Sequence, residues 1–251
     1  MIISKTPFRV SFFGGGTDYP AWYQENGGAV LSTTIDKYCY ITIRYLPPFF
    51  EHKYRIVYSI TELVQSITEI KHPVVRTLLS EYGVEKGVEI HHDGDLPARS
   101  GLGSSSAFTV GMLNSLYALL GKMISKTELA RQAIHVERDL LRENVGSQDQ
   151  VAVAFGGLNK ISFASDHNFC VEPVILKPER TATLHDHLML YFTGQSRYAS
   201  DIAADQIKNT PKNTADLKTM RRMVDEAIAV LHGGNDIREF GRLLHEAGGA
   251  A

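Results

Sequence analysis

The sequence is most informative at "LPARSGLGSSSAF", residues 96–108, where glycines bracket a leucine and serines lead into a helix-like run. A glycine loop that feeds a helix leaves the first backbone N–H groups without intrahelical partners, and the helix dipole adds positive potential there. This arrangement suits phosphate binding, and a serine hydroxyl in the first turn suits Mg²⁺. A serine-capped helix after an ordinary turn is the alternative interpretation.

The helix predicted after this loop has a clear apolar stripe with spacings of three and four residues, formed by Val110, Leu113, Leu116, Tyr117 and Leu120. Gly121 ends it. The loop is not a Walker A motif, because no lysine follows its second glycine. It is not a dinucleotide-binding fingerprint either, because Ser106 stands where the last glycine would fall.

A second glycine loop lies near the N-terminus in "PFRVSFFGGGTDYP", residues 7–20. A strand predicted over residues 1–13 leads into Gly14–Gly16, where the backbone must bend tightly or approach something closely. Asp18 follows almost at once, which is unusual for a plain turn. Trp22 and Tyr23 beyond it either line a ligand pocket or pack in the core.

A third stretch carries two acids in "HVERDLLRENVGSQDQVAVAFGGLN", residues 135–159. Ser125 and Glu128 form a capping-box pattern that opens a helix with the stripe Leu129, Ala133, Val136 and Leu140. Glu137 lies on this helix among Arg131, Arg138 and Arg142, so by itself it reads as a solvated surface group. Asp149 by itself reads as a turn acid.

The remaining pattern predicts a mixed α+β protein in two lobes, with the boundary between residues 165 and 185. The further strands are expected at residues 29–46, 54–59, 87–97, 151–163 and 184–192. The further helices are expected at residues 73–83, after Pro211, and through Phe240 and Leu244. The helix after Pro211 has the stripe Leu217, Met220, Val224, Ile228 and Leu231, and Gly233 ends it.

The composition is that of an ordinary globular protein, with 43% hydrophobic and 22% charged residues and a net charge of −2. This balance argues against nucleic-acid binding. No apolar run reaches the roughly 20 residues of a membrane span, and no targeting segment is apparent. Cys39 and Cys170 have no metal-site spacing. We therefore expect a cytoplasmic protein without a nucleic-acid or membrane partner.

Together the three stretches resemble the GHMP superfamily of small-molecule kinases. Residues 96–108 are similar to its phosphate loop, residues 6–20 to its first motif, and residues 137–150 to the segment with a metal-binding Glu and a catalytic Asp. "FTGQSRYAS", residues 192–200, resembles the start of the C-terminal lobe in the heptose kinase branch. The resemblance spans nearly the whole chain.

The resemblance implies a ribosomal-protein-like α/β domain that binds ATP, residues 1–175, and a ferredoxin-like C-terminal domain, residues 176–251. The family's third glycine-rich motif has no counterpart in "LLHEAGGAA", residues 243–251. We therefore expect the second domain to be incomplete and the chain to be C-terminally truncated. Exposed apolar faces on the last helices would favour association, as in a homodimer.

The resemblance also implies a role for each matched residue. The ATP phosphates would lie in a cradle formed by Pro97, Gly101, Leu102, Gly103, Ser104, Ser105 and Ser106. Ser105 and Glu137 would hold Mg²⁺, Asp149 would accept the proton of the sugar hydroxyl, and Arg9 would lie near the transferred phosphoryl group. The sugar would contact Gly14, Gly15, Gly16, Thr17 and Asp18, and Arg197 would meet the substrate phosphate.

The implied reaction is ATP-dependent phosphorylation of D-glycero-D-manno-heptose 7-phosphate at its anomeric hydroxyl. The 1,7-bisphosphate product would feed nucleotide-activated heptose synthesis for a surface polysaccharide. A kinase for a free sugar such as fucose is one alternative; galactose is disfavoured, because Gly15 and Gly16 replace the Glu-His of galactokinases. A non-catalytic protein that binds a sugar or a nucleotide is the other alternative.

Overall fold

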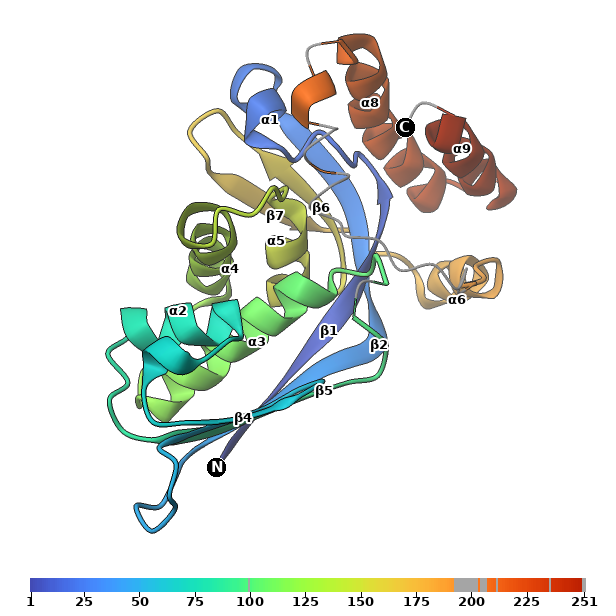
Figure 1. Ribbon diagram of the computed structural model, residues 1–251. Coiled ribbons are helices and arrows are strands. Elements are labelled where there is room, and N and C mark those ends of the chain that lie inside the picture. Colours follow the sequence, from blue (N-terminus) through green and yellow to red (C-terminus); the bar gives the residue numbers. More distant parts are fainter. Residues whose placement is uncertain (99, 192–202, 204–206, 211, 235, 250–251) are drawn as a thin grey trace. The chain divides into compact units, whose positions relative to one another are not determined.

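The computed structural model describes residues 1–98, 100–191, 203, 207–210, 212–234 and 236–249. The chain forms two compact units, shown as a ribbon in Figure 1. Unit 1 comprises residues 1–8, 35–145 and 149–155, and unit 2 comprises residues 9–34, 146–148 and 156–251. Strands β1 (Ile2–Phe13) and β2 (Gly28–Tyr45) contribute to both units. These units interleave along the chain, whereas the sequence-based division at residue 175 is contiguous and stays a prediction.

Unit 1 is built on strands in the order β4-β3-β5-β2, with β3 at Tyr54–Val57, β4 at Thr61–Val64 and β5 at Val88–Gly94. Strand β5 runs antiparallel to β2 and parallel to β3. One face of these strands is covered by helices (Figure 1). The helical segments are η1 (Ile67–Glu69), α2 (Pro73–Glu81), α3 (Ser104–Leu119), α4 (Lys126–Ile134), the π-helix η2 (His135–Leu140) and α5 (Gln148–Phe155).

The core of unit 1 lies between the strands and these helices. Alternate residues of β2, Ile41 and Ile43, face inward and are fully buried, as the period of a half-buried strand requires. They meet apolar residues of α2 and α3, including Leu78, Leu113 and Leu116. This packing includes α3, the helix that follows the phosphate-loop sequence.

Unit 2 contains strands in the order β2-β6-β7, with β6 at Leu158–Phe163 and β7 at Phe169–Pro173. Its helices are α1 (Pro20–Asn26), α6 (Pro178–Asp186), α8 (Thr214–His232) and α9 (Arg238–Gly249). Phe13 and Phe240 meet edge to face with ring centroids 5.2 Å apart. They belong to a core that includes Leu31, Met223 and Val224.

The mixed α+β class is confirmed. The strand predicted over residues 151–163 is right for β6, at Leu158–Phe163, and wrong before it, and the strand predicted over residues 184–192 is wrong at its start. Residues 151–155 belong to helix α5, and Leu184 and His185 belong to helix α6. Short apolar runs such as "VAVAF" fit either a strand or a buried helix, and here consecutive residues from Val151 to Val153 are buried. In α6 the fixed φ of Pro178 favours the first helical turn.

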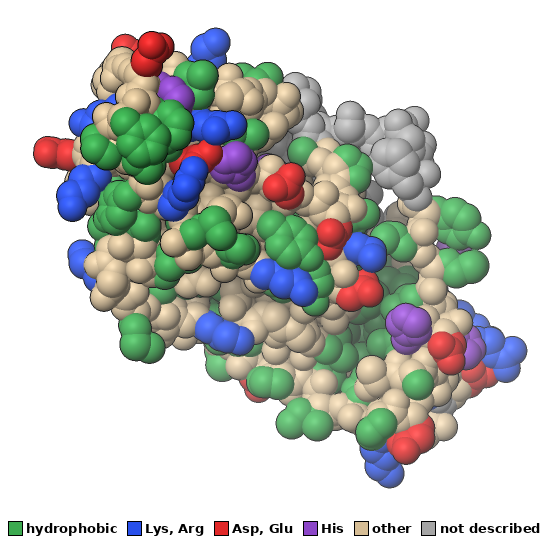
Figure 2. Space-filling model, turned by 90° about the horizontal axis from the view of Figure 1, so that it is seen from below, with side chains coloured by type: hydrophobic (Ala, Val, Ile, Leu, Met, Phe, Trp, Pro, Cys, Tyr) green, Lys and Arg blue, Asp and Glu red, His purple; other side chains and the backbone are tan. Residues whose placement is uncertain are grey.

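The surface agrees with the nearly neutral composition. On the face shown in Figure 2, Lys and Arg side chains are interspersed with Asp and Glu. In the part of the chain that the structure describes, no helix is both long and apolar enough to cross a membrane.

Candidate active site

The phosphate-loop sequence forms a loop between β5 and α3 in unit 1. Gly101 and Gly103 have φ of +75° and +72°, a conformation that costs little only for glycine. Gly103 is the N-cap of α3 and gives the helix no side-chain cap, so the serine-capped alternative is wrong. A Cβ placed on Gly101 would meet nothing within 4 Å, so the loop backbone is not tightly covered there.

The carboxylate of Glu137 lies against the first turn of α3 and is fully buried, with 0% of the residue's surface exposed. Ser106 of α3 donates its hydroxyl hydrogen bond to Oε2 of Glu137 over 2.9 Å, and Gln150 of α5 donates to the same oxygen. Oε1 is buried and has no hydrogen-bond partner among the described residues. The interpretation of Glu137 as a solvated surface group is therefore wrong.

A π-turn carries Glu137, and sequence periodicity could not predict it. Ser125 is the N-cap of helix α4, and its hydroxyl accepts the N–H of Glu128 over 3.2 Å, which is one of the two bonds of the predicted capping box. The chain then widens into η2, where the N–H of Leu141 bonds the carbonyl of Val136. The extra residue shifts the helical phase, so Leu140 is 36% exposed although its stripe was expected to be buried.

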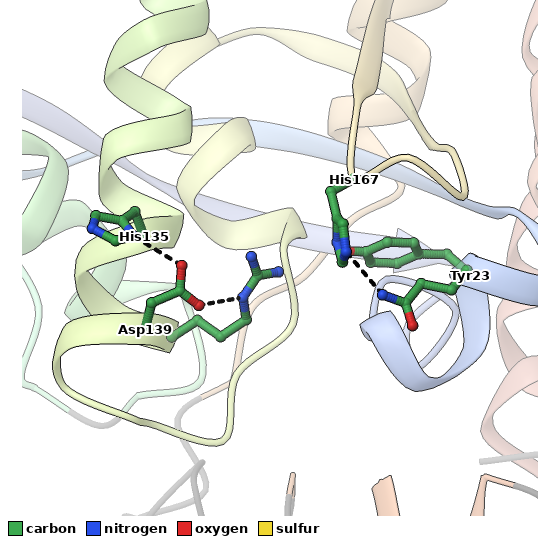
Figure 3. A network of polar contacts seen from close by, with 6 residues as sticks. Tyr23, His135, Asp139 and His167 are labelled. Carbon is green, nitrogen blue, oxygen red and sulfur yellow. Dashed lines mark hydrogen bonds and ion pairs between the residues drawn. The ribbon is translucent and has the colours of Figure 1, made fainter.

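Polar side chains that flank Glu137 in the sequence pair with one another (Figure 3). Asp139 accepts a hydrogen bond from Arg138 Nε over 3.1 Å and lies 2.8 Å from His135 Nδ1. The arginine that follows Glu137 in the sequence thus pairs with an exposed neighbour. The buried carboxylate keeps its contacts with Ser106 and Gln150.

The electrostatics of Glu137 fit a bound cation. Burial raises the pKa of its carboxyl to about 7, and hydrogen bonding by Thr109, Gln150 and Ser106 opposes that rise. A cation beside Oε1 would remove this penalty. Mg²⁺ prefers oxygen ligands and usually combines one or two carboxylates with water and substrate phosphates. The described residues contain no cluster of three or more His, Cys, Asp and Glu side chains that could hold a metal ion. A Mg²⁺ ion at Glu137 would therefore also need water and substrate phosphates as ligands.

The structure brings Ser106, and not the neighbouring Ser105, into contact with Glu137. Ser105 is exposed in the first turn of α3, and its carbonyl accepts a hydrogen bond from Thr109 Oγ1 over 3.3 Å. Its role as a magnesium ligand stays a prediction. No pattern in the sequence indicated Gln150, because an amide in a predicted turn before a strand gives no signal of a contact with the carboxylate of Glu137.

Asp149 lies half-buried in the first turn of α5, directly before Gln150. The structure therefore places it on a helix, where the sequence indicated a turn before a strand. Arg9 lies half-buried in the part of β1 that belongs to unit 2. Arg197 lies outside the described residues. The catalytic roles of Asp149 and Arg9 stay predictions.

The first glycine loop is tied down within unit 2. Thr17 is fully buried, and its hydroxyl donates to the carbonyls of Gly14 and Ala29 over 2.7 and 2.9 Å. Asp18 is 1% exposed; its Oδ1 accepts the N–H of Gly16 and its Oδ2 the N–H of Gln148, each over 3.2 Å. The sugar contacts expected of this loop stay predictions.

Trp22 and Tyr23, which follow this loop on α1, are each only 2% exposed. The Tyr23 hydroxyl lies 3.2 Å from His167 Nδ1, and Gln24 lies against the other ring nitrogen (Figure 3). Tyr23 also stacks on Phe163 of β6. Of the two readings that the sequence left open, the structure shows packing.

Comparison with known proteins identifies the segment that holds the phosphate loop, Glu137 and Asp149. Residues 67–157 match the family described as GHMP kinases N terminal domain. This segment is therefore similar to the N-terminal domain of GHMP kinases. The match includes α3, η2 and α5, the helices that carry the contacts around Glu137.

Relatives of the whole chain extend this GHMP assignment. The chain is 28% identical to D-glycero-alpha-D-manno-heptose 7-phosphate kinase of Campylobacter jejuni, covering 90% of the chain and 69% of that protein. It is 29% identical to galactokinase of Pyrococcus furiosus, covering 78% of the chain and 54% of that protein. Both alignments support an ATP-dependent sugar kinase.

A solved structure supports the GHMP fold along the chain. A D-glycero-D-manno-heptose 1-phosphate kinase from Bacteroides thetaiotaomicron superposes with a TM-score of 0.83 at 26% identity. The superposition covers 100% of this chain and 79% of that one.

Proposed function

We propose that the protein phosphorylates the anomeric hydroxyl of D-glycero-D-manno-heptose 7-phosphate with ATP, giving the 1,7-bisphosphate. The observation that carries the proposal is the buried Glu137, whose Oε1 lacks a partner among the described residues, behind the glycine-led start of α3. This arrangement lies in the GHMP segment, and two of the relatives are named as heptose phosphate kinases. The product would be used for nucleotide-activated heptose.

The residues of unit 1 supply the nucleotide half of this reaction. The loop backbone from Gly101 through Ser106 would bind the ATP phosphates at the positive end of α3. Glu137 would hold Mg²⁺, with Ser106 and Gln150 fixing the carboxylate through Oε2 and Ser105 as the predicted hydroxyl ligand. The metal would supply neutralisation of the charge that develops on the transferred phosphoryl group.

Asp149 would accept the proton of the sugar hydroxyl, a contribution that is typically worth 10²–10⁴-fold in rate. Its place in the first turn of α5 suits a negative charge. Arg9 would stabilise the transferred phosphoryl group. The loop Gly14–Thr17 would face the sugar, and Arg197 would meet its phosphate.

A kinase for a free sugar is the second candidate, and the galactokinase similarity favours it. The names of the heptose relatives also differ in the position of the phosphate, so the acceptor must be tested directly.

The test is ADP release from Mg-ATP with a panel of acceptors: heptose 7-phosphate, heptose 1-phosphate, mannose 6-phosphate, free heptose, fucose and galactose. We expect turnover with heptose 7-phosphate, reduced by at least about 10²-fold in Asp149→Asn. Asp139→Asn is the matched control, because Asp139 is an exposed acid of the same unit. Turnover restricted to a free sugar would favour the second candidate, and equal turnover of Asp149→Asn and the wild type would remove Asp149 as the base.

A further inference from the structure

We propose that Asp18 is a positioning residue, which holds Gly146–Gln148 and thereby sets the start of helix α5 and the direction of Asp149. The proposal rests on the proposed function, because it treats Asp149 as the base. It gives Asp18 a task different from the sugar contact that the sequence suggested.

Three hydrogen bonds within unit 2 hold the segment before Asp149. The N–H of Ser147 donates to the carbonyl of Asp18 over 3.0 Å, and the N–H of Gln148 donates to its Oδ2 over 3.2 Å. Ser11 of β1 donates its hydroxyl to Gln148 Oε1 over 2.6 Å. Gln148 is thus held by its backbone and by its side chain.

Gly146 lets this contact form. A Cβ on Gly146 would stand 1.8 Å from Oδ2 of Asp18, so any side chain there would displace the carboxylate. The carboxylate therefore packs directly against the backbone of the segment that it holds.

Asp18 also caps helix α5, although the two are far apart in the sequence. Gln148 is the first residue of α5, and the N–H groups of a first helical turn have no intrahelical acceptor. An acidic side chain that accepts such an N–H stabilises the helix start and complements its dipole. Because Asp149 is the next residue, fixing the N–H of Gln148 restricts the direction in which the Asp149 side chain leaves the helix.

The burial of Asp18 separates this role from sugar binding. The side chain is 1% exposed, and each carboxylate oxygen accepts a backbone N–H. A sugar ligand acts on substrate affinity, whereas a positioning residue acts on the geometry of the base and hence on kcat.

The first test measures amide hydrogen exchange at Gln148 in the protein without substrates, so it does not depend on kinase activity. We expect Asp18→Ala to accelerate exchange of this amide roughly tenfold or more, since the hydrogen bond loses its acceptor. The matched control is Asp166→Ala, which removes an exposed carboxylate that accepts the N–H of Asn168 over 3.0 Å. Unchanged exchange at Gln148 in Asp18→Ala would overturn the proposal.

The second test compares kinetic constants. We expect Asp18→Ala to lower kcat about 10- to 100-fold while the KM for the sugar stays within about threefold. Ser11→Ala, a milder variant that loses only the side-chain contact of Gln148, should lower kcat in the same direction by less. A raised KM with unchanged kcat would overturn the proposal in favour of direct sugar binding. A wild-type protein without turnover would contradict the proposed function, and the exchange test would still decide whether Asp18 holds Gln148.

Discussion

The two glycine loops look alike in the sequence and differ in their surroundings. In the loop Gly14–Asp18 of unit 2, a Cβ on Gly14 would stand 1.9 Å from the carbonyl oxygen of Ala29. In the loop before α3 of unit 1, a Cβ on Gly101 would meet nothing within 4 Å. Gly14 is needed for close packing as well as for its positive φ, whereas Gly101 is needed for its positive φ alone.

This difference shows that a glycine run is not by itself a sign of ligand contact. Thr17 and Asp18 are buried and hold the first loop to its own unit. The second loop ends at Gly103, the N-cap of α3, which has no side chain. In the first turn of α3, Ser106 bonds the buried carboxylate of Glu137, whose Oε1 has no hydrogen-bond partner among the described residues. The second loop therefore has the stronger structural case for binding a ligand.

The largest expected effect comes from Gly14→Ala. The new methyl group would collide with the Ala29 carbonyl and approach Val224, at a residue with φ of +85°. We expect a loss of about 3–5 kcal/mol in the free energy of unfolding, measured by urea denaturation. Gly101→Ala, with a positive φ and no collision, should lose only about 1 kcal/mol. Equal losses would erase the distinction between the loops.

Glu137→Gln tests the charge behind the second loop. The folded pKa of Glu137 is raised to about 7 from an ordinary value of 4.5, so the folded state binds the proton more tightly than the unfolded state. This carboxyl therefore removes stability as pH rises from about 4.5 to 7. At pH 8 the variant should be up to about 3 kcal/mol more stable than the wild type, with the gain fading near pH 4.5. Denaturation at both pH values without Mg²⁺ measures it, and a gain independent of pH would refute the assignment.

Thr17→Val tests the bonds that hold the first loop. The variant keeps the shape but loses the hydroxyl that bonds Gly14 and Ala29, leaving their buried backbone groups without that partner. We expect a loss of about 1–3 kcal/mol in unfolding free energy. Thr181→Val serves as the control, because it removes an exposed hydroxyl bond to the carbonyl of Lys177 and should change stability little.

Gly15→Ala has the smallest expected effect on folding and sharpens the functional side of the comparison. Gly15 has no positive φ, and a Cβ there would meet nothing within 4 Å. We expect a stability change within about 0.5 kcal/mol. If the loop faces the sugar, the KM for the sugar should rise while the KM for ATP is unchanged. Unchanged constants for both substrates would place the sugar elsewhere.

Sequence reasoning found the elements with strong local signals. The strand before Gly14, the N-cap at Ser125 and the long helix capped by Gly233 are all present. It failed where the decisive contact is distant: α5 read as a strand, although Asp18, far away in the sequence, accepts the N–H at its start. It also misjudged Glu137, because a π-turn changes the helical phase without any mark in the residue pattern.

The most direct test of the contrast between the loops is backbone amide exchange, measured by NMR with and without Mg-ATP. The account predicts that Mg-ATP slows exchange at Gly101 and Ser104–Ser106, while the amide of Thr17, which already bonds the carbonyl of Gly14 over 3.0 Å, is slow in both states. Mg-ATP that leaves the amides of α3 unchanged, or protects only the loop Gly14–Asp18, would contradict it.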